Sequence, residues 1–395
     1  MIASEDISNI DTNSFHANSK HFDCHDLLTV PFSSGTTGKP KGVMLSHHNL
    51  LSNVLQCMPY EGDYIKPKVK NDWSTRGTVL VPLPFFHIYG MTAGMCVPLN
   101  AGGKLILMAQ FDLQKYLEIV QNHKVTRSYV VPPIVLGLAK HPIVNNYNLS
   151  SLECLMSGAA PLGSDVQAMA AKRLNCIIKQ AWGMTELSPA ATIIPDNMVR
   201  NHDDILGKSG VLVPGTEGKI VDPVSGKDMN SNEEGEIMIR GPQVMQGYFD
   251  NIEATNSTLR KDGWLHTGDI GKFEGEDEWL VITDRCKELI KYKGFQVPPA
   301  ELEARILSMP SVKDCVVIPV IDEEAGELPR AYVVKADGAT ITEQDVIQFV
   351  EKHVAPHKRL RGGVVFTDSI PKSASGKLLR RVQIQIDREQ SKKVN

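Results

Sequence analysis

The sequence lacks the paired cysteines that a disulfide framework or a structural zinc site would need. Its seven cysteines are scattered over 395 residues, their number is odd, and no CxxC pair occurs. Proteins of reducing compartments use cysteine in this way. Residues 4–20 are polar and contain no apolar signal-peptide core. We therefore expect a cytoplasmic protein without disulfides, in which residues 1–26 form a disordered leader.

A strong excess of charge of one sign is also missing. The chain has 42 Lys and Arg against 46 Asp and Glu, a formal net charge of −4. A nucleic-acid-binding domain is usually strongly basic, so no nucleic-acid partner is expected. The charge is uneven, because residues 350–395 hold 11 basic and 4 acidic residues, a net +7, and the preceding residues sum to −11. This basic segment either closes over a phosphate-bearing ligand or is a solvated helical tail.

One segment, residues 77–103, contains no Lys, Arg, Asp or Glu and is long enough to cross a bilayer. It is interrupted by Pro82, Pro84, Pro98 and several glycines, and it contains His87. Prolines and glycines at this density break a membrane helix. We expect a buried strand, loop and helix here, and no transmembrane segment.

The pattern of apolar runs predicts an α/β body followed by a separate small unit. Hydrophobic residues at 42% and charged residues at 22% are ordinary for globular proteins. Buried strands are predicted at residues 27–32, 78–83, 104–108 and 128–131, and helices at 114–123 and 165–173. Because strands and helices alternate, a largely parallel sheet is expected. Residues 207–281 instead favour an antiparallel β-subdomain, with strands at 218–221, 235–239 and 279–282.

The last hundred residues predict a compact α+β unit. A helix opens at Pro298 and Pro299, since proline is favoured in the first turn. Thr342, with Asp345 three residues on, predicts the start of a second helix over residues 343–354. Strands are predicted at residues 312–319, 331–334 and 363–366. The junction with the body is placed near residues 284–287.

The run SSGTTGKPKG, residues 33–42, follows a predicted strand and precedes a helical pattern. Its glycines let the backbone direct amide groups at an anion, and its hydroxyls and lysines add donors. It is not a Walker A loop, because Lys39 is followed by Pro40, and it is not a GxGxxG motif. The run favours polyphosphate binding over an ordinary loop. The residues concerned are Ser33, Ser34, Gly35, Thr36, Thr37, Gly38, Lys39 and Lys41.

This run and six later motifs resemble, in order, those of the adenylate-forming (AMP-binding) superfamily. That superfamily includes acyl-CoA synthetases, 4-coumarate–CoA ligases and beetle luciferases. The later motifs are PFFHIYG (84–90), SGAAPL (157–162), QAWGMTE (180–186), GWLHTGD (263–269), DRCKELIKYKGFQVPPAELE (284–303) and PKSASGKLLRR (371–381). The last two motifs, which are also the longest, are most similar to those of the 4-coumarate–CoA ligase and luciferase branch.

The resemblance implies a two-domain protein. A large adenylation domain, with α/β sheets and a β-subdomain, would span residues 27–285, and a small α+β C-terminal domain would span 286–395. Such relatives carry a long α/β stretch before the phosphate loop. We therefore expect an N-terminally shortened large domain with exposed apolar edges, as in an alternative isoform or an incomplete gene prediction.

The resemblance also implies a reaction in two steps. A carboxylate attacks the α-phosphate of ATP, giving acyl-AMP and pyrophosphate, and coenzyme A then displaces AMP. Thr36, Thr37, Lys39 and Lys41 would contact the β- and γ-phosphates. Thr185 would contact the α-phosphate. Glu186 would hold Mg²⁺, a hard cation that prefers oxygen ligands.

Further nucleotide contacts follow from the same motifs. Asp269 would accept both ribose hydroxyls, helped by Arg285. Trp182, where the family usually has tyrosine, would stack on the base. The segments that wall the adenine and acyl pockets are Gly158, Ala159, Ala160, Gln180, Ala181, Trp182, Gly183 and Met184.

A lone histidine in an apolar run, such as His87, is more often a satisfied core residue than a catalyst. Its match to the family segment PxFHxxG implies a role near the substrate carboxylate instead, with Tyr89 and Ala159 lining the acyl pocket.

Lys377, in the small-residue loop SASGK, is implied as the catalytic cation that stabilises the adenylation transition state. Lys287 would be the hinge between the domains. Rotation there would withdraw Lys377 and bring in a second set of residues for thioester formation. This set comprises catalytic Lys291 and the coenzyme A contacts Lys293, Gly294 and Gln296.

The sequence thus predicts an ATP-dependent acid–CoA ligase for an aryl-propenoic or a medium- to long-chain fatty acid, using ATP, Mg²⁺ and coenzyme A. Gln110 stands where a plant ligase has a lysine that contacts coenzyme A, and the C-terminus is not the SKL-type signal of the alternative, peroxisomal location. Other functions stay open: luciferase-like adenylation with another acceptor, and a non-catalytic nucleotide-binding relic. A nucleic-acid binder using the basic tail would need aromatic residues that 382–395 lack.

Overall fold

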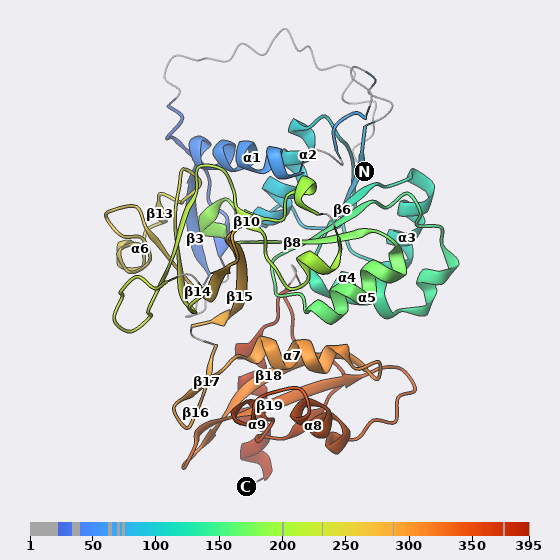
Figure 1. The fold of residues 1–395 in the computed structure, drawn as a ribbon, viewed down its shortest axis with the longest axis vertical. Helices are drawn as coiled ribbons and strands as arrows, with labels where there is room; N and C mark the ends of the chain where they lie inside the picture. The colour runs from blue at the N-terminus through green and yellow to red at the C-terminus, as the bar shows by residue number, and fades with distance from the viewer. Residues whose placement is uncertain are drawn as a thin grey trace.

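The computed structural model describes residues 23–33, 40–61, 65–68, 72, 76–199, 201–230, 232–286, 288–373 and 376–394. Figure 1 shows a larger upper part built around several sheets and a smaller lower part that contains the C-terminal helices and strands. Within these residues, no helix is both long enough and apolar enough to span a bilayer.

A seven-stranded sheet forms the centre of the larger part, in the order β10-β9-β8-β7-β6-β4-β5. The five strands from β8 to β5 pair in parallel, and β9 and β10 are antiparallel. The prediction of an α/β body with a largely parallel sheet is confirmed. The bounds are β4 (Thr78–Val81), β5 (Lys104–Leu107), β6 (Arg127–Val130), β7 (Cys154–Ser157), β8 (Ile177–Gly183), β9 (Ala190–Ile193) and β10 (Val211–Leu212).

Helices pack on this sheet where apolar periodicity predicts them. The predicted helices 114–123 and 165–173 correspond to α3 (Leu113–His123) and α5 (Ser164–Leu174). The Asp112 side chain caps α3 by accepting a hydrogen bond from the Lys115 amide at 2.8 Å. The other helices of this part are α1 (His47–Glu61), α2 (Val97–Asn100), α4 (Pro132–Lys140) and α6 (Ile252–Thr258).

The uncharged run 77–103 lies inside the larger part. It forms β4, a π-helical segment at Tyr89–Cys96 and α2. The strand, loop and helix expected there are therefore close to what is found.

Two smaller sheets complete the larger part. The predicted β-subdomain is a four-stranded antiparallel sheet of β11 (Glu217–Val221), β12 (Gly235–Arg240), β14 (Leu265–Glu274) and β15 (Trp279–Arg285). The sequence did not predict β14, because its motif GWLHTGD has no clear period-2 alternation. The other sheet contains β1 (Leu27–Thr29), β2 (Phe32–Ser33), β3 (Lys41–Ser46) and β13 (Gly247–Tyr248).

The prediction of one buried strand over residues 27–32 is wrong. The segment forms two short strands that pair antiparallel with β3, and the chain is irregular between them. Leu27, Leu28 and Phe32 are 45%, 43% and 68% exposed. Their apolar character predicted burial, but only the other face of this small sheet packs on the core.

Apolar side chains are also exposed elsewhere in the larger part. The strand β5 is an edge of the central sheet. Leu107 at its end and the nearby Leu99 and Phe111 are exposed, which agrees with the apolar edges expected from the sequence.

The smaller part is the α+β unit that the sequence predicts. Its sheet has the order β17-β16-β19-β18, with β20 parallel to β19. The capping box of Thr342 and Asp345 is present at the start of α8. The bounds are β16 (Ile290–Tyr292), β17 (Phe295–Val297), α7 (Pro299–Ser308), β18 (Val312–Asp322), β19 (Gly326–Lys335), α8 (Glu343–Glu351), β20 (Val364–Phe366) and α9 (Arg380–Val394).

The two parts meet where α7 lies against α5 (Figure 1). The Lys140 ammonium, at the end of α4, donates to the backbone carbonyls of Leu307, Met309 and Val312 at 2.7, 2.8 and 2.8 Å. Carbonyl groups at the end of a helix lack partners within the helix and carry partial negative charge, so a cation there is favourable. An Arg305–Asp165 ion pair at 3.0 Å adds a second polar link.

Four buried charges lie together beneath the central sheet. Arg127 and Lys179 pair with Glu61 and Asp196, and all four side chains are almost completely buried. The Tyr129 hydroxyl also donates to Glu61, at 2.9 Å. Two cations and two anions compensate one another, so the loss of a single member leaves an uncompensated buried charge.

Arg127→Met tests this cluster, because methionine is similar in length but uncharged. We expect the free energy of unfolding to fall by about 3–5 kcal/mol, measured by urea denaturation. Lys68→Met is the matched control, since Lys68 forms a largely exposed ion pair with Glu153 and should change stability by less than about 1 kcal/mol. Equal effects of the two substitutions would contradict the account.

Candidate functional site

A cavity of about 730 Å³ opens between the larger part and the smaller part. Its wall is formed by residues of β2, β3, β8, β14 and β15, by the segment around His87, and by the loop before α9. Most described residues of the predicted site lie on this wall. They are Ser33, Lys41, His87, Tyr89, Gly158, Ala159, Ala181, Trp182, Gly183, Met184, Thr185, Glu186, Asp269, Arg285 and Lys377.

Other predicted residues lie elsewhere or are not described. Ala160 and Gln180 are not on the wall, and the Gln180 amide group instead donates to Gln167 at 2.9 Å and to the Leu162 carbonyl at 3.2 Å. The residues outside the described part of the chain are Ser34, Gly35, Thr36, Thr37, Gly38, Lys39, Lys287 and, from the expected leader, residues 1–22.

One wall of the cavity holds a carboxylate between two donors. Trp182 Nε1 donates to Asp269 Oδ2 at 2.8 Å, and Arg285 Nε lies 3.2 Å from Asp269 Oδ1. Gly183 follows Trp182 at the end of β8, where a Cβ atom would lie 1.9 Å from the Pro189 carbonyl oxygen. Only glycine fits this crossing of two backbones, so the Gly in the motif QAWGMTE shapes the wall.

Next to this wall, Glu186 is buried and accepts a hydrogen bond from the Tyr248 hydroxyl at 2.7 Å. The Lys41 ammonium lies 4.7 Å from the centre of the Tyr248 ring. Burial and the Glu186 charge raise the pKa of Tyr248, so its hydroxyl stays a donor. Lys41, Tyr248 and Glu186 thus form a continuous polar strip.

His87 and Tyr89 form the opposite side of the cavity. His87 Nδ1 accepts the Tyr89 amide at 3.2 Å, which places its proton on Nε2. Burial, and then the charge of Lys377, lower the pKa of His87. The Tyr89 hydroxyl donates to the Met156 carbonyl at 2.8 Å. A Cβ atom at Gly158 would lie 3.1 Å from the Tyr89 ring, so this glycine leaves room for the tyrosine.

The inner end of the cavity was not predicted from the sequence. Cys57, Glu61 and Tyr129 line it, and Glu61 belongs to the buried charge cluster. Apolar groups, among them Val97, Met156 and Ile193, line the path between His87 and this end. The chamber is therefore mainly apolar, with hydrogen-bonding groups at its far end.

Lys377 enters the cavity from the smaller part. Its amide donates to Ser373 Oγ at 3.1 Å, its carbonyl accepts from the Ser373 amide at 2.9 Å, and Gly376 has φ +76°. These two hydrogen bonds hold the backbone of Lys377 next to Ser373. Burial, followed by the charge of Arg285, lowers the pKa of Lys377 to about 8.

Lys291, Lys293, Gly294 and Gln296 are not brought to the cavity. They lie on the exposed hairpin of β16 and β17, whose two-residue turn has positive φ at Lys293 and Gly294. In Figure 1 this hairpin forms a flank of the smaller part, at the lower left.

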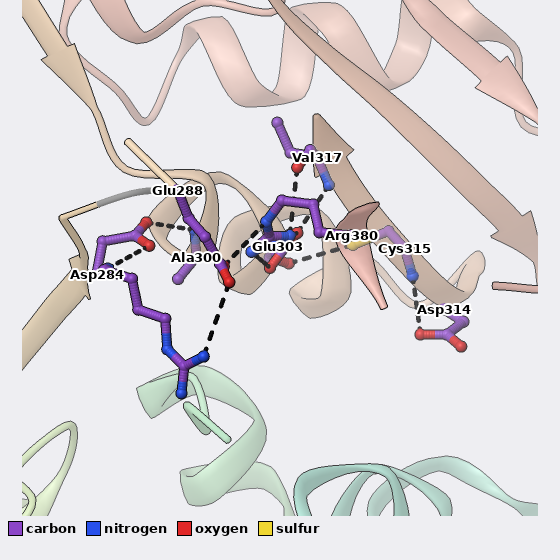
Figure 2. Close-up of polar contacts among 9 residues, drawn as sticks. Asp284, Glu288, Ala300, Glu303, Asp314, Cys315, Val317 and Arg380 are labelled. Carbon is purple, nitrogen blue, oxygen red and sulfur yellow. Dashed lines mark hydrogen bonds and ion pairs between the residues drawn. The ribbon is translucent and has the colours of Figure 1, made fainter. Parts of the chain in front are cut away.

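The chain on either side of residue 287 is held by buried charges, shown in Figure 2. Asp284 accepts the amide of Ala300, in the first turn of α7, at 3.1 Å, and its burial raises its pKa to about 6. Arg380 pairs with Glu288 at 3.2 Å and with Glu303 at 2.5 Å (Figure 2). Asp284 therefore ties the end of β15 to the smaller part, and Glu288 does the same through Arg285, whose Nη1 lies 3.8 Å from Glu288 Oε1.

Comparison with known proteins decides the family. The sequence pattern of AMP-binding enzymes matches residues 3–249, and that of the AMP-binding enzyme C-terminal domain matches residues 301–377. The chain belongs to the AMP-binding enzyme family. The resemblance that the seven motifs indicated is therefore confirmed.

Curated relatives of this chain include 4-coumarate–CoA ligases. It is 46% identical over 357 residues to 4-coumarate–CoA ligase 1 of Solanum tuberosum, covering 90% of this chain and 64% of that protein. It is 45% identical over 358 residues to probable 4-coumarate–CoA ligase 1 of Dictyostelium discoideum, covering 90% and 62%. The chain thus spans a little under two thirds of the length of these relatives.

Solved structures agree on the fold. ATP-bound MatB from Rhodopseudomonas palustris has a TM-score of 0.81 at 31% identity, over 92% of this chain and 69% of that one. The o-succinylbenzoate CoA synthetase MenE from Bacillus subtilis, in complex with the acyl-adenylate intermediate OSB-AMP, has a TM-score of 0.76 at 26% identity, over 91% and 69%.

Three residues of the cavity wall, Tyr248, Glu61 and Tyr129, were not predicted from the sequence. Tyr248 lies in a two-residue strand, and its link to Glu186 depends on the pairing of β13 with β3. Glu61 ends an amphipathic helix, where an acid is ordinarily solvated. The one sequence signal for this buried charge cluster was Arg127, a charged residue at the start of a run of strand-forming residues.

Gly183→Ala tests the geometry of the cavity wall that holds Asp269. The added methyl group would meet the Pro189 backbone, which cannot move aside as a side chain can. We expect a loss of about 1–3 kcal/mol in the free energy of unfolding, measured by urea denaturation. The control is Gly137→Ala in α4, where nothing lies within 4 Å of the new atom, and a gain of up to about 1 kcal/mol is expected. Equal stability of Gly183→Ala and the unsubstituted chain would show that the crossing is looser than described.

Proposed function

We propose that this chain is an ATP-dependent acid–CoA ligase. The observation that carries the proposal is the shared cavity, which brings Asp269, His87 and Lys377 together from three separate motifs. The 46% identity to 4-coumarate–CoA ligases supports the same activity. We further propose that residues 27–285 act as the adenylation domain and residues 286–395 as the mobile C-terminal domain.

In the first step, a carboxylate oxygen of the acid attacks the α-phosphorus of ATP. A bond to that phosphorus forms, the bond to pyrophosphate breaks, and acyl-AMP remains. Negative charge builds on the phosphoryl oxygens, where a positioned cation stabilises the transition state most strongly in a cavity that excludes water. We assign this role to the Lys377 ammonium, with Thr185 as a further donor.

The substrates divide the cavity between them. We assign the ribose to Asp269 and Arg285, the base to the wall formed by Gly158, Ala159 and residues 181–184, and the phosphates to Lys41 and the loop 33–39. His87 is neutral at pH 7, because its pKa is lowered, so its Nε2–H can donate to the acid carboxylate without adding a charge.

The residues present fit a magnesium ion. Mg²⁺ at nucleotide sites is usually held by one or two carboxylates and by substrate phosphates. Glu186 supplies one such carboxylate, held in place by the Tyr248 hydroxyl. When bound, the ion neutralises part of the phosphate charge.

Of the two acid classes expected, the cavity favours an aryl-propenoic acid. The apolar walls suit a flat ring, and Glu61 and Tyr129 at the inner end can hydrogen-bond to a ring substituent. A long alkyl chain would place its end against this charged cluster, whose members are already paired with one another, and would form no hydrogen bond there.

In the second step, the coenzyme A sulfur attacks the acyl carbon, AMP leaves, and the thiol proton is released. We propose that rotation near Lys287 breaks the Asp284 contact with α7 and removes Lys377 from the cavity. The exposed hairpin with Lys291, Lys293, Gly294 and Gln296 would then turn toward the acyl-AMP, as in the domain alternation that the family resemblance implies.

Lys377→Ala separates the two steps. We expect acid-dependent ATP–pyrophosphate exchange to fall about 10²–10³-fold, because the cation is lost. Thioester formation from supplied acyl-AMP and coenzyme A should stay close to that of the unsubstituted chain. Lys372→Ala is the control, since Lys372 pairs with Asp314 outside the cavity. Equal loss in both steps would contradict the specific role, and nucleotide binding without any exchange by the unsubstituted chain would establish a non-catalytic relic.

The lowered pKa of Lys377 also predicts a pH dependence. The protonated amine is the active form, so kcat/KM for ATP in the exchange reaction should fall as the pH rises through about 8. An ordinary lysine would lose its proton only near pH 10. In Lys377→Arg the positive charge persists at higher pH, so kcat/KM should no longer fall near pH 8. A fall at the same pH in Lys377→Arg would assign the titration to another group.

A further inference from the structure

The hydrogen bond between Trp182 and Asp269 joins two separate sheets at the cavity wall. Trp182 lies in β8 of the central sheet and Asp269 in β14 of the β-subdomain, 87 residues apart. Their exposed fractions are 9% and 8%. The indole ring packs in the core cluster that contains Val43, Leu45 and Ile239, so its N–H direction is fixed by packing.

The indole does more than offer an aromatic face. Its Nε1–H is a donor only, and it is satisfied by Asp269 Oδ2 at 2.8 Å. The Arg285 guanidinium pairs with the other oxygen, Oδ1, at 3.2 Å. Each oxygen of the Asp269 carboxylate thus has its own donor. Together the two donors fix the orientation of the carboxylate group.

A carboxylate has about four acceptor positions, two on each oxygen. With one position on each oxygen taken by Trp182 and Arg285, one position on each remains for a ligand. Two adjacent hydroxyl groups match this arrangement, because each can donate to a different oxygen in a charge-assisted hydrogen bond. A sugar with a single hydroxyl leaves one of the oxygens without its second donor.

We propose that Trp182 is a positioning residue, which orients Asp269 through its indole N–H so that the cavity selects nucleotides with both ribose hydroxyls. This inference depends on one part of the proposed function, namely that ATP binds in this cavity. It assigns to Trp182 a role that stacking on the base would not provide. Phenylalanine could stack in the same place but could not donate to Asp269.

The test measures the dissociation constants of ATP, 2′-deoxy-ATP and 3′-deoxy-ATP by calorimetry, with Mg²⁺ and without a carboxylic acid. For the unsubstituted chain we expect each missing hydroxyl to weaken binding roughly 10- to 100-fold, as for hydrogen bonds to charged groups. In Trp182→Phe this discrimination should shrink by about tenfold, because Asp269 is no longer oriented.

The matched control is Trp264→Phe. Trp264 lies between the side chains of Lys219 and Arg240, outside the cavity, so its substitution should leave the discrimination unchanged. If Trp182→Phe weakens all three nucleotides by the same factor, or none, the positioning role is overturned while nucleotide binding stands. If the unsubstituted chain binds no nucleotide, the proposed function fails and the inference with it.

If Trp182→Phe does not fold, a second measurement on the Trp182 indole tests the positioning role. The chain has four tryptophans, so the Nε1–H resonance of Trp182 can be assigned by substituting the other three. We expect this proton to stay hydrogen-bonded and to exchange more slowly with solvent when AMP binds than when 2′-deoxy-AMP binds. A return of the resonance to the position of a free indole on binding AMP, or equal exchange with both nucleotides, would overturn the proposal.

Discussion

The packing of α7 on α5 joins the smaller part to the larger part, in the arrangement that places Lys377 in the cavity. Lys140 donates to the carbonyls of Leu307 in α7, of Met309 just after it and of Val312 in β18, and in the same arrangement Lys377 lies in the cavity. The hairpin with Lys291 is exposed. Both lysines belong to the smaller part, so in the proposed domain rotation the contacts that hold Lys377 in the cavity must break before Lys291 can enter it. The position of Lys377 therefore depends on an interface that combines the Lys140 and Arg305 contacts, the Asp284–Ala300 hydrogen bond and the apolar packing of Leu307.

The charge distribution along the sequence gains a structural meaning in this arrangement. The basic residues after 350 are not a solvated tail throughout, since Lys377 is in the cavity and Arg380 is buried between Glu288 and Glu303. Burial of Lys377 near Arg285 makes its charge easier to lose. An anionic ligand between them would reverse this effect, because opposite charge favours the protonated amine. The cavity is thus electrostatically suited to a phosphate-bearing ligand.

Much of the fold follows from local sequence, and most of what was missed depends on contacts between distant segments. Apolar periodicity and caps located α3, α5 and α8 because these signals act within a few residues. The segment 27–32 was wrongly predicted as buried, since burial depends on what covers a strand and not on the strand itself. For the site, glycine-rich and charged motifs identified the residues that gather at the cavity. The Trp182–Asp269 bond, the Tyr248–Glu186 bond and the polar inner end could not be predicted, because each joins segments more than 60 residues apart.

The central claim is that an acid carboxylate attacks the α-phosphorus of ATP in this cavity. The most direct test supplies an aryl-propenoic acid labelled with oxygen-18 in its carboxylate, together with ATP, Mg²⁺ and coenzyme A, and analyses the AMP by mass spectrometry. The account predicts AMP that carries one oxygen-18 atom, because the attacking oxygen stays on phosphorus when the thiol takes the acyl group. Formation of acyl-CoA with unlabelled AMP, or nucleotide binding without any AMP formed, would contradict it.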